Sequence, residues 1–262
     1  MKGSFVNMTY HFIRTRKDGY VFTLTLARPE KRNAFTPTMV NEIDHALKAA
    51  NADKDVRVVV IRAEGPVFCA GMDLKAFTDP GADRLNPAIE NRNLSLGEVM
   101  MQLNKPSVAL VEGNVMAGGF LVVAECTFVL ARPEAEFSLP EVKIGIFPFQ
   151  VLASLLKIMP EKKAMQLCIS GEPFSACQAR EYGIVDELLE EGTAERLVSR
   201  LTENAPLAVS RGFEALKGLD KVPGTERFHH LKSALDRLRD SHDAEEGIRA
   251  LFEKRKPEWK NE

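Results

Sequence analysis

The sequence lacks a strong charge imbalance. Its 262 residues carry 35 Lys and Arg against 37 Asp and Glu, which gives a formal net charge of -2. Proteins that bind nucleic acids usually show a clear basic excess, and none is present here, although local basic patches are compatible with the composition. We therefore expect no nucleic-acid partner.

Long apolar runs are also missing. No run is long enough to span a bilayer, and the amino-terminal stretch MKGSFVNMTYHFIRTRKDGY contains no apolar core of signal-peptide length. We expect no membrane association and a cytoplasmic location. An organelle-targeting segment removed ahead of this sequence would leave no trace in it.

Cysteine is scarce and scattered. No close pair of the kind used in zinc sites occurs among the four cysteines, which are Cys69, Cys126, Cys168 and Cys177. This spacing predicts reduced, mostly buried thiols and no metal site. No histidine is placed by sequence to activate a thiol, which disfavours cysteine catalysis. We interpret His229 and His230 as a pair on a helix face.

What is present is a large apolar fraction, 45% of the residues, which suits one large globular domain or one domain with an appendage. Alternating and β-branched runs predict strands over residues 20–26, 56–61, 108–111 and 128–131, with helices between them. The order strand, turn, helix, strand predicts an α/β fold. Because the chain becomes helical and charge-rich near residue 190, we predict a core over residues 1–190 and a helical region over 191–262.

The stretch from Glu112 to Phe149 carries the strongest functional signal. Within it, Gly118 and Gly119 precede an apolar run, at a point where a turn should become the first turn of a helix. Amide hydrogens at such a point lack internal partners and can hold an oxyanion. The competing interpretation is an ordinary tight turn.

Glu141 is the second signal in this stretch. It follows Pro140 and is surrounded in sequence by apolar residues, so its side chain is expected to be partly desolvated. Desolvation raises a carboxyl pKa towards values useful to a general base. The competing interpretation is a solvated carboxylate on an edge strand.

A similar turn occurs earlier in the chain. Ala70 and Gly71 precede another predicted helix start, where backbone amides could face a ligand. Asp73 follows them, and we interpret it as a cap or ion-pair partner at the helix start. An upstream loop carries the cations Arg28, Lys31 and Arg32.

These segments together resemble the crotonase superfamily, also called the enoyl-CoA hydratase/isomerase family. The resemblance rests on LARPEKRNAF, FCAGMDL, NKPSVALVEGNVMAGGF, FSLPEVKIGI, GEPFSACQAREYGIVDEL and EEGIRALFEKRKP, in the family's order and approximate spacing. It implies a crotonase-like spiral of ββα units with a helical trimerisation region, assembled as a homotrimer or a dimer of trimers. It also implies an acyl-CoA thioester as ligand, with no cofactor beyond the coenzyme A of the substrate.

The resemblance also implies the roles of individual residues. The thioester carbonyl would lie between the backbone amides of Ala70 and Gly118, and Glu141 would be the acid/base. Substrate contacts carried over from the family's motifs are Arg28, Lys31, Arg32, Ala34, Cys69, Met72, Asp73, Leu74, Gly119, Leu121, Phe149 and Lys254. For Lys254 and Arg255 the alternative is a pair of cations at a helix C-terminus.

One departure from the hydratase pattern narrows the range of expected reactions. Hydratases of this family carry two glutamates, and the first of these positions is Leu121 here. Together with Phe147 and Phe149 after Glu141, this is similar to monofunctional Δ3,Δ2-enoyl-CoA isomerases, which use one glutamate. Glu125 lies one helical turn beyond Leu121, and we interpret it as a structural ion-pair member.

Several alternatives stay open at this point. They are a hydratase with a second acid from elsewhere, a decarboxylase, a thioester hydrolase, and a non-catalytic acyl-CoA binding protein. A peptidase on the related spiral fold is disfavoured because no nucleophile turn of the GxSxG kind is present.

Overall fold

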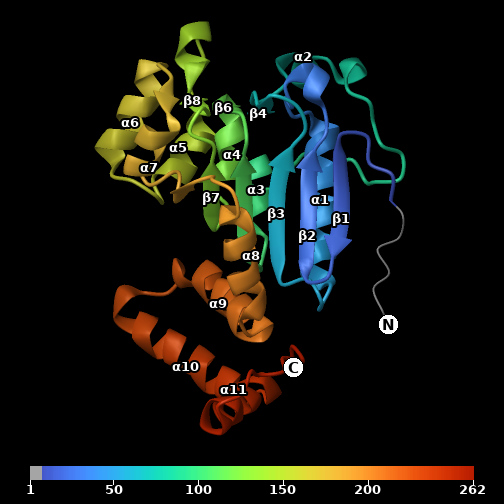
Figure 1. Ribbon diagram of the computed structural model, residues 1–262. Coiled ribbons are helices and arrows are strands. Elements are labelled where there is room, and N and C mark those ends of the chain that lie inside the picture. The colour runs from blue at the N-terminus through green and yellow to red at the C-terminus, as the bar shows by residue number, and fades with distance from the viewer. Residues whose placement is uncertain (1–7) are drawn as a thin grey trace.

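The computed structural model describes residues 8–262. The first seven residues of the amino-terminal stretch discussed above lie outside the described part. The chain forms two sheets with helices packed around them (Figure 1). No helix within residues 8–262 is long and apolar enough to cross a membrane.

The large sheet has six strands in the order β1-β2-β3-β5-β7-β10. β1 is antiparallel to β2, and the remaining neighbours are parallel. The strands are β1 (Ile13–Asp18), β2 (Val21–Leu26), β3 (Val58–Ala63), β5 (Ser107–Val111), β7 (Phe128–Ala131) and β10 (Glu187–Leu188). In β2 the predicted alternation is observed, since Phe22, Leu24 and Leu26 are buried on one face.

The small sheet has four short strands in the order β4-β6-β8-β9. β4, β6 and β8 are parallel, and β9 is antiparallel to β8. The strands are β4 (Val67–Cys69), β6 (Asn114–Met116), β8 (Glu136–Ser138) and β9 (Phe174–Ser175). Our sequence interpretation did not predict this sheet or β1. The strands of the small sheet have two or three residues and show no usable alternation, and β1, with the sequence IRTRKD, fully buries only Ile13.

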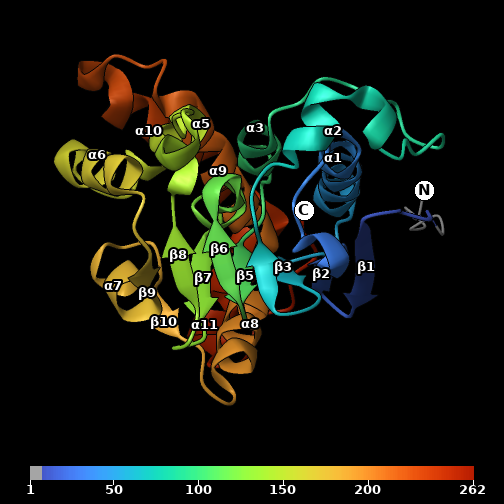
Figure 2. The same ribbon diagram turned by 90° about the horizontal axis from the view of Figure 1, so that it is seen from above.

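Helices pack around both sheets (Figure 2). They are α1 (Pro37–Ala52), α2 (Leu74–Thr78), α3 (Leu96–Met101), α4 (Phe120–Val123), α5 (Phe149–Leu155), α6 (Glu161–Ser170) and α7 (Ala176–Glu181). α1 begins as the sequence predicts, with the Thr36 side chain accepting from the Met39 amide and Pro37 in the first turn. The buried side chains of α1, β2 and β3 belong to the same main apolar core.

The remaining helices form the carboxyl-terminal region. α8 (Thr193–Glu203) packs Leu197 against an apolar cluster on the outer face of the large sheet that includes Val58, Val60 and Leu130. α9 (Pro206–Leu219), α10 (Arg227–Arg239) and α11 (His242–Glu253) follow, beyond the end of the sheet opposite α2 (Figure 1). The helical nature predicted beyond residue 190 is confirmed, while the division into two units stays a prediction.

Candidate active site

The carboxyl ends of three neighbouring strands meet at one edge of the small sheet. Cys69 of β4 lies beside Val115 of β6, and Met116 lies beside Ser138 of β8. The segments that leave these ends are residues 70–73, 117–119 and 139–141. Because ligands of open parallel sheets bind beyond the carboxyl ends of the strands, this edge is the candidate active site.

Glycines allow the first two of these segments to touch. A Cβ atom at Gly71 would lie 2.7 Å from the Ala117 Cβ and 3.0 Å from the Gly118 amide nitrogen. A Cβ atom at Gly119 would lie 2.7 Å from the carbonyl oxygen of Cys69. Ala117 itself has φ 50°, a left-handed conformation that is uncommon for alanine and recurs at functional sites. The two chain segments are therefore held in close contact at the cost of local strain.

The amide of Ala70 is not a donor for a ligand. It donates to the carbonyl oxygen of Arg32 at 3.0 Å. This hydrogen bond corrects the prediction that Ala70 and Gly118 form the oxyanion pair. An amide that already has a backbone partner gains little by turning towards a substrate oxygen.

The Met72 amide is the available donor on this segment. Phe35 forms backbone hydrogen bonds with both neighbours of Met72. Its amide donates to the Gly71 carbonyl oxygen at 2.8 Å, and its carbonyl oxygen accepts from the Asp73 amide at 2.9 Å. Successive amides of an extended segment point to opposite sides, so the Met72 amide points away from Phe35. Within residues 8–262, the amides of Met72 and Gly118 donate no backbone hydrogen bond. These two amides form the candidate oxyanion pair.

Glu141 is a buried carboxylate with an unpaired oxygen. It lies in a 3₁₀ helix, Pro140–Ile144, just beyond β8, and is only 8% exposed. Its Oε2 atom is buried and has no hydrogen-bond partner within the described chain. Burial raises the pKa of Glu141, and a hydrogen bond with its own backbone partly opposes the increase. The edge-strand alternative is therefore wrong, and the carboxyl is placed to exchange a proton.

Leu121 brings no proton-transfer group to the site. It lies in α4, is 3% exposed, and faces α3, where a Cβ atom at Gly97 would meet its Cδ2 at 3.4 Å. Glu125, one turn further along, accepts hydrogen bonds from Ser154 Oγ and Lys157 Nζ, both at 2.7 Å. The interpretation of Glu125 as a structural ion-pair member is confirmed.

Arg28 and Asp73 form an ion pair. The Arg28 guanidinium donates to Asp73 Oδ2 at 2.7 Å and to the carbonyl oxygen of Ala34 at 2.8 Å, and Arg28 is 8% exposed. Asp73 caps α2 by accepting from the Lys75 and Ala76 amides, as the sequence predicts. Burial acts to raise the pKa of Asp73, but the hydrogen bonds from Arg28 and the amides lower it overall. Both residues also line the hollow beside this loop, so the prediction that they contact substrate stays a prediction.

An open hollow of about 500 Å³ lies beside this loop. Its cations Lys31, Arg32 and Lys75 are exposed, so they can meet an anionic group that enters from solvent. The hollow is lined by Arg28, Glu30, Lys31, Arg32, Ala34, Asp73, Lys75 and Ala82. Lys31 and Arg32 stay candidates for the phosphates of coenzyme A.

The other predicted contacts differ in exposure and in position. The Cys69 thiol is buried, donates to the Asn33 carbonyl at 3.2 Å, and has its pKa raised to about 12 by burial, so it is a packing residue. Leu74 and Phe149 are exposed, at 46% and 75%, and can contact an acyl chain. Lys254 ends α11, on the side of the molecule away from α2, so this chain's own Lys254 does not reach its site (Figure 1).

Two residues important for the site were not predicted. The buried Asn33 side chain donates to the Glu64 and Val67 carbonyls and accepts from the Arg28 amide, which fixes the loop against the start of β4. Phe35 pairs with the Met72 segment. Both lie in LARPEKRNAF, and the motif marked the loop as important without showing which contacts it makes.

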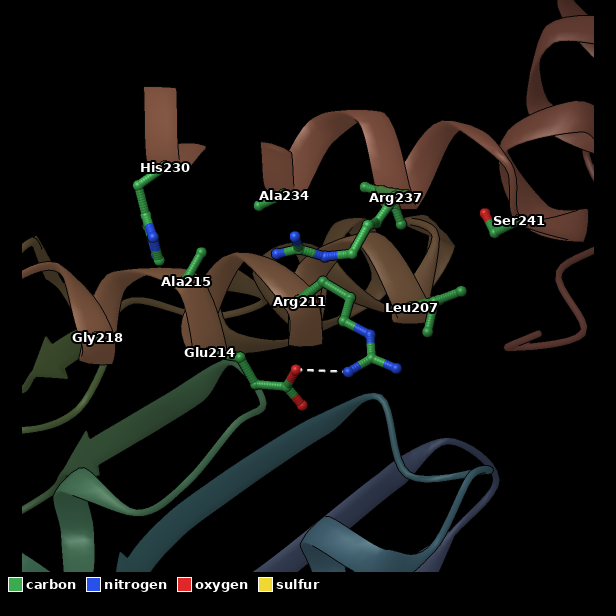
Figure 3. Close-up of a pocket in the computed structure, with 10 residues that line it drawn as sticks. Leu207, Arg211, Glu214, Ala215, Gly218, His230, Ala234, Arg237 and Ser241 are labelled. Carbon is green, nitrogen blue, oxygen red and sulfur yellow. Dashed lines mark hydrogen bonds and ion pairs between the residues drawn. The ribbon is translucent and has the colours of Figure 1, made fainter. Parts of the chain in front are cut away.

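A separate cavity of about 530 Å³ lies between α9 and α10 (Figure 3). Its one carboxylate, Glu214, is paired with Arg211 at 2.6 Å, and His230 also lines the cavity. Within residues 8–262 no cluster of three or more His, Cys, Asp or Glu side chains could hold a metal ion.

Comparison with known proteins agrees with this geometry. The family model described as enoyl-CoA hydratase/isomerase matches residues 16–262. A mevalonyl-coenzyme A hydratase of Aspergillus fumigatus is 32% identical over 251 residues, covering 92% of each chain. The mitochondrial enoyl-CoA hydratase domain-containing protein 3 of Rattus norvegicus is 30% identical, covering 94% of this chain and 83% of the relative.

Solved structures show the same relationship. The crystal structure of an enoyl-CoA hydratase from Mycobacterium tuberculosis H37Rv superposes with a TM-score of 0.85 at 30% identity, covering 96% of this chain and 99% of that one. The expected crotonase-like fold is confirmed. The chain therefore belongs to the enoyl-CoA hydratase/isomerase family of acyl-CoA enzymes.

Proposed function

We propose that the protein is an enoyl-CoA isomerase that converts a 3-enoyl-CoA into a 2-enoyl-CoA. The observation that carries the proposal is the single buried carboxylate, Glu141, with an unpaired oxygen, combined with an apolar Leu121 at the family's other acid position. We assign Glu125 a structural role in place of that of a second acid, because its Oε1 atom accepts hydrogen bonds from both Ser154 and Lys157.

The reaction begins with loss of a proton from carbon 2 of the substrate. Ionised Glu141 takes this proton, and the electron pair of the broken C–H bond moves into a dienolate whose oxygen carries the negative charge. The Met72 and Gly118 amides donate hydrogen bonds to that oxygen. One such donor in a site closed to water contributes about 3 kcal/mol to transition-state stabilisation.

The same carboxyl group completes the reaction. Protonated Glu141 returns its proton to carbon 4, and the double bond then lies between carbons 2 and 3. The proton that leaves one carbon is added at another, so no water and no second acid are consumed. The raised pKa of Glu141 suits both steps, because the group must accept and release a proton at similar pH.

The alternative is hydration of a 2-enoyl-CoA. It is favoured by the names of the relatives, which include several enoyl-CoA hydratases. Hydration requires a positioned water, which adds its oxygen to carbon 3 while a proton is added to carbon 2, and two carboxylates suit this work. A hydratase built on this site would need an acid that is not found beside Glu141 in the described chain.

Two parallel assays separate these functions. The purified protein is offered a 3-enoyl-CoA and, separately, a 2-enoyl-CoA, and products are followed by chromatography. We expect conversion of the 3-enoyl substrate to the 2-enoyl product with little hydration. Formation of 3-hydroxyacyl-CoA from the 2-enoyl substrate at a comparable rate would overturn the isomerase proposal. Tight binding of both substrates without turnover would instead indicate a non-catalytic member.

A further inference from the structure

Phe35 holds the Met72 segment through its backbone. Its amide donates to Gly71 O at 2.8 Å and its carbonyl accepts from Asp73 N at 2.9 Å, which forms a short parallel bridge opposite Met72. Both residues that flank Met72 are therefore fixed by the same partner. The direction of the Met72 amide depends on where Phe35 lies.

The side chain of Phe35 contacts the other donor. Its Cε1 and Cζ atoms lie 2.9 and 3.0 Å from the position that a Cβ atom at Gly118 would occupy. The ring therefore fills the space beside Gly118 and limits how far that backbone can move. Phe35 is 6% exposed, and the Phe77 ring supports it edge to face with centroids 6.1 Å apart.

Phe35 is anchored next to the start of α1. The next residue, Thr36, is the N-cap of α1, a sixteen-residue helix whose inner face is part of the main core. One residue thus connects a rigid helix to both chain segments that carry unpaired amides.

We propose that Phe35 is a positioning residue that sets the separation and direction of the Met72 and Gly118 amides. The inference rests on the oxyanion pair of the proposed function. It does not depend on whether the enolate leads to isomerisation or hydration. Because hydrogen bonds to a developing oxyanion require donors at about 2.7–3.1 Å, small displacements of either segment weaken the stabilisation.

The test uses Phe35→Ala and Phe35→Leu, with Phe174→Ala and Phe174→Leu as matched controls. Phe174 is 7% exposed and packs among the Phe137, Phe120 and Tyr182 rings, so its truncation removes a comparable buried ring from another part of the core. The main readout is the infrared band of a ¹³C-labelled thioester carbonyl in a bound saturated acyl-CoA. This band reports hydrogen bonding to the carbonyl without any turnover.

We expect the wild-type protein to shift the band to lower frequency and Phe35→Ala to lose most of this shift while still binding the ligand. Its kcat should fall about tenfold or more, with a much smaller change in KM, because the donors act chiefly on the transition state. Phe35→Leu should give a band shift and a kcat between those of the wild type and Phe35→Ala. The Phe174 variants should lower the melting temperature and leave the band unchanged.

The outcomes separate the two proposals. A wild-type band shift that persists in Phe35→Ala, or in Phe35→Leu if the alanine variant does not fold, would overturn the role of Phe35. Equal effects of the Phe35 and Phe174 variants on the band would also overturn it, since they would reflect general destabilisation. A protein that hydrates rather than isomerises, but shows the wild-type shift and its loss in Phe35→Ala, would overturn only the isomerase assignment.

Discussion

At the scale of single residues, the chemistry depends on the contrast between Glu141 and Leu121. Both are buried, yet only Glu141 can carry a proton. Its Oε2 atom lacks the hydrogen bonds that would stabilise the ionised carboxylate. A buried group of this kind lowers the stability of the fold and is typical of a catalytic acid or base.

Glu141→Gln should remove activity and stabilise the fold. Glutamine cannot accept the proton, so kcat should fall by about 10²–10⁴-fold. It also avoids burying a charge, so we expect a gain in unfolding free energy of about 1 kcal/mol at neutral pH. Turnover assays and thermal melting check both effects. Glu136→Gln, at an exposed position of β8, is the control, and equal losses in both variants would contradict the assignment.

The pH dependence of the wild-type protein follows from the raised pKa of Glu141. The base is inactive when protonated, so kcat/KM should fall as pH decreases through this raised value. For stability the sign is opposite: the folded state holds the Glu141 proton more tightly than the unfolded chain, so its contribution favours folding at low pH and is lost as pH rises. A pH–rate profile whose acidic limb lies at an ordinary glutamate pKa would contradict the desolvated base.

Leu121→Glu should add hydratase activity. The new carboxylate would lie at the family's second acid position, so 3-hydroxyacyl-CoA should form from a 2-enoyl-CoA. Leu121→Gln is the matched control, because it has a similar shape but no ionisable proton. Both should be destabilised by about 2–4 kcal/mol, since Leu121 is buried against α3. A folded Glu variant without hydration would show that more than one carboxylate is missing.

At the scale of elements, the site is held by links between short segments. α4 has only four residues, Phe120–Val123, too few for a stable isolated helix. It is stabilised by packing against α3. The hydrogen bonds that Glu125 accepts from Ser154 and Lys157, near the end of α5, stabilise it further.

Glu125→Gln tests whether this link is structural. We expect a loss of about 1–2 kcal/mol in unfolding free energy, because a charged, partly buried hydrogen-bond pair is weakened. The kcat should stay unchanged, as measured with the 3-enoyl substrate alongside urea denaturation. A large fall in kcat without loss of stability would identify Glu125 as a second acid.

At the scale of the whole molecule, the carboxyl-terminal tail is fixed against α11. The Asp243 carboxylate accepts from the Lys260 and Asn261 amides at 2.8 and 2.9 Å. Glu246 accepts two hydrogen bonds from Arg255 at 2.6 and 2.9 Å. Trp259, further along the tail, donates to the Glu203 carbonyl at 2.7 Å, which connects the tail to the end of α8.

Glu246→Gln should loosen this tail. The hydrogen bonds from Arg255 lower the pKa of Glu246 from 4.5 to about 2, so its contribution is present above pH 4.5 and is lost as pH falls towards 2. Trp259 is the only tryptophan, so its emission reports the tail directly. The variant should show, at neutral pH, the red-shifted emission that the wild type reaches only in acid. Glu245→Gln on the same helix is the control, and an equal shift there would contradict the assignment.

We also propose assembly into a trimer or a pair of trimers, as the family resemblance implies. It is supported by large apolar side chains left exposed on the carboxyl-terminal helices, including Phe228 at 89% and Phe252 at 81%. Light scattering should give a mass of several chains, and Phe228→Asp should reduce it. A mass of 29.1 kDa for the wild type would contradict assembly.

The sequence by itself determined the features that depend on neighbouring residues. Alternation in residues 20–26 predicted a strand, Thr36 and Pro37 predicted the start of α1, and the order of motifs indicated the family. The glycine pair and Glu141 were also identified in this way, because apolar neighbours in sequence indicated a partly desolvated carboxyl, with a solvated edge-strand carboxylate as the alternative.

Only the tertiary structure decided which groups are free to act. The Ala70 amide and the Arg28 guanidinium looked available in the sequence, but each has a partner distant from it along the chain, in Arg32 and Asp73. The Met72 amide and Phe35 became significant for the same reason. Availability depends on long-range hydrogen bonds and burial, and these exist only once strands and loops far apart in sequence have come together.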